Sequence, residues 1–336
     1  MNHFKIASIA CLFLIYCVKT EAQVNPSVQL DSVIKSYQNH KGYDHNAYPL
    51  GLFTKDYYKN EVEFAQTKLD ELSKVNTEEL SETEQISAEL LKFVLQDQID
   101  FYKFDMYLNP ILSDTGFHSD LPYIVRPLTN YQQVKKYLDK LNAIPEFVNE
   151  NLINLREGIA KGISQPLVIF KGYESTYNDN IVDDFKDSFY YSPFKNLPND
   201  LTETQKDSVL AAARIAIEIN VTPQFKRIKT FFETEYLPKT RTTLGVSETP
   251  NGDAFYQNRI NFYTTSTQYT ADDIHQIGLK EVARIKAEME IIIKDLNFKG
   301  SFADFLKFLR TDKQFYAKTP RELLMIARDI AKRIDA

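Results

Sequence analysis

The segment QYTADDIHQIGLKEVARIKAEMEIIIKDL, residues 268–296, decides the fold class of this chain. Its apolar residues recur every three or four positions, which places them along one face of an α-helix. Thr270 and Asp273 precede this pattern at the spacing of a variant capping box, a common signal for a helix start. The segment therefore predicts a long amphipathic helix packed on a core through Ile274, Gly278, Val282, Ile285, Met289, Ile292 and Leu296.

The histidine in this segment does not belong to a zinc-peptidase motif. Such a helix carries His-Glu-x-x-His, because ligands four residues apart share one face of the helix. Leu279 stands four residues after His275, and Glu281 points about 120° away around the helix. We interpret His275 as a residue at the edge of the apolar face, with a catalytic or binding role as the alternative.

The same periodicity recurs along most of the chain and predicts an all-α protein. Helices are expected near residues 55–76, 80–108, 130–162, 203–236, 271–296, 301–310 and 320–335. Strand-like alternation is limited to residues 259–265 and, more weakly, 167–170. Long irregular loops rich in proline, glycine and asparagine are expected at 109–128, 164–202 and 238–269.

Asp97 interrupts an apolar stripe of the second predicted helix. Ile86, Leu90, Val94 and Phe101 surround it at helical spacing, so the sequence predicts that this stripe faces the core. A buried carboxylate must be paired or hydrogen-bonded. We expect Asp97 to be largely buried and to pair with another helix; a carboxylate that lines a cleft is the alternative.

The first 22 residues predict a signal peptide. Lys5 precedes an apolar run over residues 6–18, and small residues lead to a cleavage site after Ala22. This run is too short for a membrane-spanning helix. Bulky Tyr16 precedes Cys17, where a lipoprotein has a small residue, and so does not favour a lipid anchor. We expect export to the periplasm, the cell envelope or the medium, with no stable membrane anchor.

Composition and motifs exclude several classes of function. The net charge of −6 and the lack of a basic cluster do not favour a nucleic-acid partner. His40 and His45 are five residues apart without a clear third ligand, which is weak evidence for a metal site. Nucleophile elbows, phosphate loops and dinucleotide fingerprints are absent. The sequence therefore predicts no catalytic residue, no metal ligand and no cofactor in this chain.

The last predicted helix remains amphipathic to its final turn, without a glycine cap or a proline stop. We therefore expect residues 23–336 to be the helical N-terminal portion of a larger domain that is truncated at its C-terminus. A missing C-terminal half is expected to pack on helices 271–296 and 320–335. The apolar positions of the last helix are Leu323, Ile326, Ala327, Ile330 and Ile334.

Four segments together resemble the bacterial family called domain of unknown function 885. They are LREGIAKGISQP (155–166), GDAFYQNRINFYTTSTQYTADDIHQIGLKEVARIKAEM (252–289), SFADFLKFLRTDKQFYAKTPRELL (301–324) and IAKRIDA (330–336). The resemblance implies an exported, largely helical zinc metallopeptidase with a zincin-like scaffold. The family's zinc motif, His-Glu-Ala-x-Pro-Gly-His, has no match here, so zinc is expected only in the full-length family member. Gly158 and Gly162 more simply predict a close helix approach or a helix end.

The resemblance also places a substrate cleft near FYQNRINFYTT, residues 255–265. It implies Tyr256, Arg259, Tyr263 and Thr265 as substrate-binding residues, although loop packing explains them equally well. The expected function is the N-terminal part of an exported zinc-dependent peptidase, inactive alone, with a peptide as substrate. The alternative is a non-catalytic helical envelope protein that binds a peptide or another ligand.

Overall fold

The computed structural model describes residues 25–111 and 116–335, so the predicted signal peptide lies outside the described residues. The described residues form α-helices and short 3-10 and π-helical turns, without a β-strand. Two isolated bridges, Ile111 to Gly116 and Pro166 to Arg241, are the extended pairings among them. The all-α prediction is confirmed. The chain divides into two compact units, Met1–Tyr256 and Gln257–Ala336.

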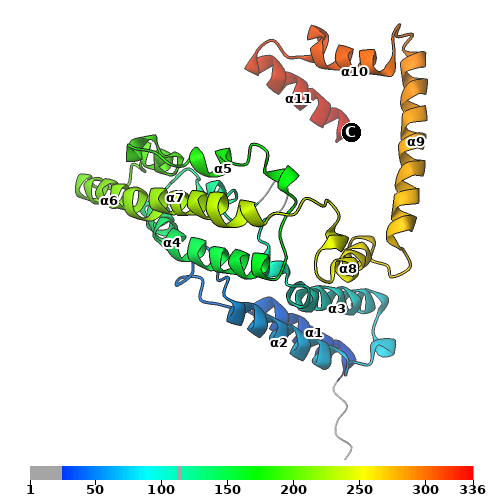
Figure 1. Ribbon diagram of the computed structural model, residues 1–336, viewed down its shortest axis with the longest axis horizontal. Helices are drawn as coiled ribbons and strands as arrows, with labels where there is room; N and C mark the ends of the chain where they lie inside the picture. Colours follow the sequence, from blue (N-terminus) through cyan, green and yellow to red (C-terminus); the bar gives the residue numbers. More distant parts are fainter. Residues whose placement is uncertain (1–24, 112–115, 336) are drawn as a thin grey trace, which may run out of the picture. The chain divides into compact units, whose positions relative to one another are not determined.

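The first unit begins with a small three-helix bundle, drawn in blue and cyan in Figure 1. It contains α1 (Pro26–Asn39), α2 (Lys55–Leu72) and α3 (Glu82–Lys103), and α2 and α3 pack closely along their lengths. Each helix starts at a side-chain cap, and Ser81 and Glu84 form a complete capping box on α3. The bundle core consists of Leu30, Val33, Ala65, Leu72, Val75, Leu80, Ala88, Leu91 and Leu95.

The core-facing stripe predicted for α3 is wrong. Ile86 and Leu90 are 56% and 60% exposed, whereas Leu91 and Leu95 are buried. The helix carries two apolar stripes, and α1 and α2 cover the one that starts at Ala88. Consequently Asp97 is half-buried rather than buried. It lines a cavity of about 210 Å³ whose wall also includes Tyr57, Tyr58, Glu61, Gln98, Phe101 and Tyr102, which agrees with the cleft alternative.

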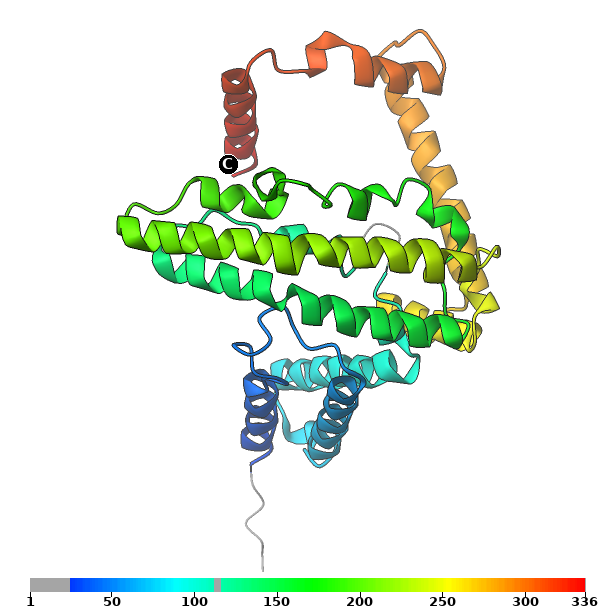
Figure 2. The same cartoon turned by 60° about the vertical axis from the view of Figure 1, so that its left-hand side comes forward.

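Two long parallel helical rods form the larger part of the first unit and lie side by side in Figures 1 and 2, with cross-contacts from Asn142 to Asn220 and from Arg156 to Glu235. One is α4 (Tyr131–Ala160); the other joins α6 (Glu203–Ile215) and α7 (Thr222–Phe231) through a π-helical segment, Ala216–Val221. A second π-helical segment, Phe232–Tyr236, extends α7. Each π-helical segment lies immediately before a proline region, at Pro223 and Pro238, where the ordinary helical hydrogen bond cannot form.

An aromatic core joins these rods to the loop that covers them. The loop includes α5 (Ser175–Asn178) and several 3-10 turns, and its aromatic side chains pack against those of α7. The predicted helices at 130–162 and 203–236 are confirmed. The largest buried side chains of this core include Tyr190, Tyr236, Phe225, Phe231, Phe232, Leu141, Ile144, Leu152 and Leu155.

The two predicted strand segments are helical. Residues 259–265 mostly belong to α8 (Gly252–Thr264), and Leu167–Phe170 is a 3-10 turn. A short alternating segment without a partner strand cannot satisfy its backbone, whereas a helix satisfies the backbone locally. Helices α1, α5 and α8 are additional to the seven that periodicity predicted.

The second unit contains α9 (Ala271–Asp295), α10 (Phe302–Thr311) and α11 (Pro320–Ile334). Thr270 caps α9 as the sequence predicts, and Ser301 and Thr319 cap α10 and α11. Phe298, Phe305, Phe308 and Phe315 form a chain of ring contacts around α10.

The expected packing of α9 on a core is wrong for this unit, because most of its apolar stripe is exposed. The apolar stripe of α11 is exposed in the same way. The exposed large apolar residues, within these stripes and beside them, are Ile277, Leu279, Val282, Ile285, Ile291 and Ile292 on α9, Leu296 directly after it, and Leu323, Leu324, Met325, Ile326, Ile330 and Ile334 on α11.

Candidate functional site

The four residues predicted to bind substrate lie on or directly after α8. Tyr256, Arg259 and Tyr263 follow one another at intervals of three and four, so they share one face of the helix. Tyr256 and Tyr263 are 46% and 80% exposed, and the Arg259 guanidinium lies 4.8 Å from the centre of the Phe262 ring. Thr265 follows the helix end with a left-handed φ of 49°. Their role in substrate binding remains a prediction.

A cavity of about 270 Å³ lies at the start of α8, entirely within the first unit. It is lined by segments that are far apart in the sequence: the end of α3, the turn after α4 and the loop before α8. The four predicted residues are not among those that line it, although Phe255 is the neighbour of Tyr256. The apolar wall consists of Phe104, Met106, Ile163, Val246, Pro250 and Phe255, and the polar wall of Asp105, Asn109, Ser164, Gln165, Arg241 and Thr249.

Gly158 of α4 determines how closely the segment that follows α3 approaches α4. A Cβ atom at this position would be 2.5 Å from the backbone oxygen of Leu108, so only glycine permits the contact. Gly162 ends α4 with a φ of +79°, and the Ile163 amide donates to the Gly158 carbonyl at 2.8 Å, which is the pattern of a Schellman motif. The prediction of a close helix approach and a helix end at these two glycines is confirmed.

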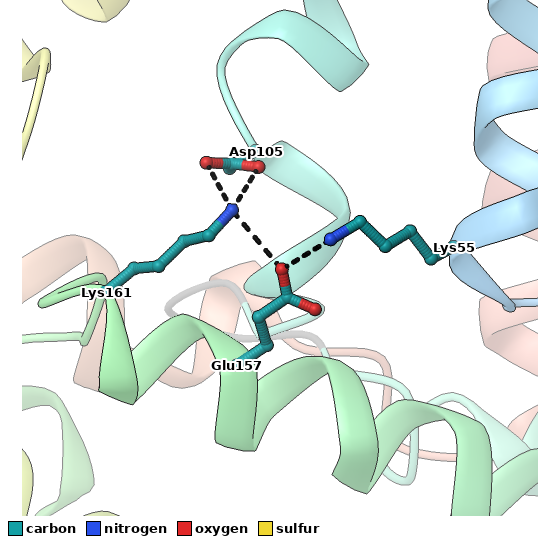
Figure 3. A network of polar contacts seen from close by, with 4 residues as sticks. All are labelled: Lys55, Asp105, Glu157 and Lys161. Atoms are coloured by element: carbon teal, nitrogen blue, oxygen red, sulfur yellow. Dashed lines mark hydrogen bonds and ion pairs between the residues drawn. The ribbon is translucent and has the colours of Figure 1, made fainter.

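A network of charged side chains beside the cavity joins α2, the turn after α3 and the end of α4 (Figure 3). Lys161 Nζ donates to both carboxylate oxygens of Asp105, at 2.9 and 3.0 Å, and lies 3.3 Å from Glu157 Oε1. Lys55 Nζ donates to the same Glu157 oxygen at 2.9 Å. The hydrogen bond from Lys55 lowers the pKa of Glu157. Because these side chains are partly exposed, their ion pairs contribute little to the stability of the fold. Their main effect is to hold the four side chains in position.

Asp105 and Arg241 are the charged residues of the cavity wall. Asp105 has a left-handed φ of 54°, which is uncommon for a residue other than glycine and orients its carboxylate toward Lys161. Arg241 donates through Nε to the Ser164 carbonyl at 2.9 Å and through Nη1 to the carbonyls of Thr243 and Gly245, at 2.9 and 2.6 Å. These hydrogen bonds hold the loop after α7 against the turn after α4.

Asn109 adds an unsatisfied acceptor to this wall. Its Oδ1 atom is buried and has no hydrogen-bond partner among the described residues. Gln165 is engaged, since its Nε2 donates to the Ile111 carbonyl and its backbone amide donates to the Tyr236 hydroxyl. Asp105, Asn109 and Arg241 were not identified from the sequence, because they stand in segments without a recognisable motif. The available signal for this site was the Gly158–Gly162 spacing, which indicates a close approach of α4 to another segment.

Metal binding finds no support in the described residues. Residues 25–111 and 116–335 contain no group of three or more His, Cys, Asp or Glu side chains that could hold a metal ion. His275 is exposed on α9, and His40 stacks on Phe64 and lies 2.8 Å from Glu61. Within the same residues, no helix combines the length and the apolar character needed to cross a membrane.

Comparison with known proteins agrees with the fold. The chain is similar to the crystal structure of a candidate lipoprotein from Colwellia psychrerythraea, with a TM-score of 0.70 and 17% sequence identity. The match covers 92% of this chain and 58% of that protein, so the chain spans less than two thirds of its length. No functionally curated protein matches the sequence.

The family assignment rests on the sequence. The model of the family described as "Bacterial protein of unknown function (DUF885)" matches residues 37–336, which is most of the chain. The chain therefore belongs to the DUF885 family of bacterial proteins.

Proposed function

We propose that this chain is the non-catalytic helical part of an exported, zinc-dependent peptidase-like hydrolase. In this proposal residues 1–22 are a signal peptide, and the zinc ion is held by polypeptide outside residues 23–336. The apolar faces of α9 and α11 bind that polypeptide and complete a zincin-like domain. The observation that carries the proposal is the exposure of these two faces.

The exposure of α11 is extreme for an amphipathic helix. Leu323, Ile326, Ile330 and Ile334 form one stripe and are 45–78% exposed. Soluble monomers rarely expose a contiguous apolar patch larger than a few hundred Å². Burial would contribute roughly 25 cal/mol for each Å² removed from water, so coverage of these faces is strongly favoured. The length of the solved relative, of which this chain matches 58%, supports additional polypeptide as the covering partner.

We expect the isolated chain to self-associate through α11. Size-exclusion chromatography with light scattering should show oligomers for the wild type and monomers for the triple variant Leu323→Gln, Ile326→Gln, Ile330→Gln, because the variant removes the apolar stripe. Arg321→Gln, Arg328→Gln, Lys332→Gln on the same helix is the matched control and should still self-associate. A wild-type chain that runs as a stable monomer would contradict the proposal.

We also expect the purified chain to hold no stoichiometric zinc and to cleave no peptide. The reason is that the described residues offer no three convergent ligands. Elemental analysis after dialysis against a weak chelator, with a peptide-hydrolysis assay on the same sample, measures both. One tightly held zinc per chain would show that this part of the protein is itself the catalytic part.

A second function is favoured by the cavity beside α8. A non-catalytic helical envelope protein that binds a peptide or a small ligand requires such a cavity and no metal. The light-scattering experiment separates the two functions. The first predicts self-association of the isolated chain through its uncovered apolar faces, whereas a free-standing binding protein should be a stable monomer.

A further inference from the structure

We propose that the cavity beside α8 binds an apolar group that carries a carboxylate, the chemistry of a peptide C-terminal residue. The carboxylate-bearing group is a ligand class for the proposed function. The identification of a peptide as the source of that group rests on the proposed function. The binding site itself is argued from three features of the cavity wall: an arginine without a counter-charge, an unsatisfied amide oxygen and a pair of phenyl rings.

The first feature is the charge of Arg241. Its three hydrogen bonds go to neutral carbonyl groups, and no ion pair of Arg241 is found within the described parts of the chain. The other charged group of the wall, Asp105, is neutralised by Lys161 at 2.9 Å. The wall therefore has one positive charge in excess, and Nη2 of Arg241 remains available as a donor among the described residues. A carboxylate is the anion that a guanidinium binds with favourable geometry.

The second feature is Asn109. A buried amide oxygen without a donor is unfavourable relative to a hydrogen-bonded one, so a ligand that supplies an N–H group is favoured here. The amide that precedes a peptide's last residue carries one N–H group close to the terminal carboxylate. Because Oδ1 is buried, the Asn109 side chain has to turn toward the cavity before a ligand N–H group can reach this atom. A peptide end can then satisfy both Asn109 and Arg241, whereas a simple inorganic anion satisfies only the arginine.

The third feature is the size and the character of the remaining wall. The rings of Phe104 and Phe255 lie 6.0 Å apart between centroids, and Met106, Ile163 and Pro250 complete the apolar lining. A volume of about 270 Å³ is at the lower limit of small-molecule sites, which suits one residue and not a longer segment. An apolar C-terminal side chain fits this wall better than a charged one.

The absence of tryptophan in the chain makes the test direct. Acetyl-Ala-Trp, with a free carboxylate, can be excited selectively and its anisotropy followed as the full chain is added. We expect saturable binding, and at least 10-fold weaker binding of acetyl-Ala-Trp-amide, because the amide removes the charge that Arg241 recognises. Indole-3-propionate tests a second source of the same chemistry. Weaker binding of this acid than of the peptide supports a peptide C-terminus, and equal binding assigns the site to small aromatic acids.

Variants connect the binding to the cavity. Arg241→Gln should weaken the binding of acetyl-Ala-Trp at least 10-fold, and Arg214→Gln, on the exposed face of α6, is the matched control and should not change it. Because Arg241 also holds its loop, Asn109→Ala provides a second variant; within the described residues, Asn109 Oδ1 makes no hydrogen bond that this substitution would break. Asn109→Ala should weaken the binding of acetyl-Ala-Trp about 5-fold and leave the affinity for indole-3-propionate unchanged. Equal affinity for acid and amide, or unchanged affinity in both variants, would overturn the proposal. Neither result depends on zinc or on oligomeric state, so the outcome is independent of the proposed function.

Discussion

Replacing Gly158 by alanine is expected to lower the free energy of unfolding of the first unit by about 2–3 kcal/mol, in the range measured for overpacked cores. In an open helix the same change stabilises by up to about 1 kcal/mol. At Gly158 the added Cβ atom would lie 2.5 Å from the Leu108 carbonyl oxygen, a backbone atom that cannot rotate away. Helix α4 and the turn Met106–Leu108 would have to separate. Urea unfolding followed by tyrosine fluorescence measures the change.

Gly278→Ala on α9 is the matched control for this substitution, because nothing lies within 4 Å of a Cβ atom at that position. It should leave the unfolding of the first unit unchanged. The separation of α4 from the turn would also displace Asp105 and Asn109, so Gly158→Ala should weaken ligand binding in the cavity together with stability. A Gly158→Ala variant as stable as the wild type would show that the approach of α4 is not tight.

Acid is expected to destabilise the first unit through His118. This side chain is 0% exposed and packs among the rings of Phe117, Tyr173 and Phe232. Burial lowers the pKa of His118 to about 3. The Thr176 hydroxyl donates to the Tyr173 carbonyl and lies 2.9 Å from His118 Nε2, so Nε2 carries the proton and Nδ1 is bare. Nδ1 has no partner among the described residues, and a second proton there would be a buried, unpaired donor.

The sign of the pH dependence follows from the direction of this shift. The folded state binds the proton less well than the unfolded state, whose ordinary pKa is about 6.5. The contribution to stability is therefore complete above pH ~6.5 and is lost as the pH falls toward the folded pKa, by about 2 kcal/mol between pH ~7 and pH ~5. Urea unfolding at a series of pH values measures this slope.

The matched control is His118→Gln, which keeps a donor for Thr176 and removes the titration. Its stability at neutral pH should be lower than that of the wild type, because glutamine fills the aromatic cage less well, and its pH dependence between pH ~7 and pH ~5 should be flatter. The exposed His275→Gln should leave the wild-type slope unchanged. If the wild type and His118→Gln had the same slope, His118 would not be the group that titrates.

The helices could be predicted because each depends on a local pattern. The cap at Thr270 and the apolar periodicity act within one or two turns, and the structure confirms this helix start. The cavity could not be predicted in the same way. Arg241 and Asn109 are distant in sequence and belong to no motif, and they share a wall only because α4 and the loop after α7 bring them together.

Which apolar stripe is buried was likewise decided by tertiary packing. Helix α3 has two apolar stripes; periodicity selected the one with Ile86 and Leu90, whereas α2 covers the one with Leu91 and Leu95. On α9 the sequence specifies an amphipathic helix but not what covers its apolar face. Propensity, capping and periodicity are local and are encoded by the sequence directly; burial depends on which surface another element occupies, and that is a property of the assembled structure.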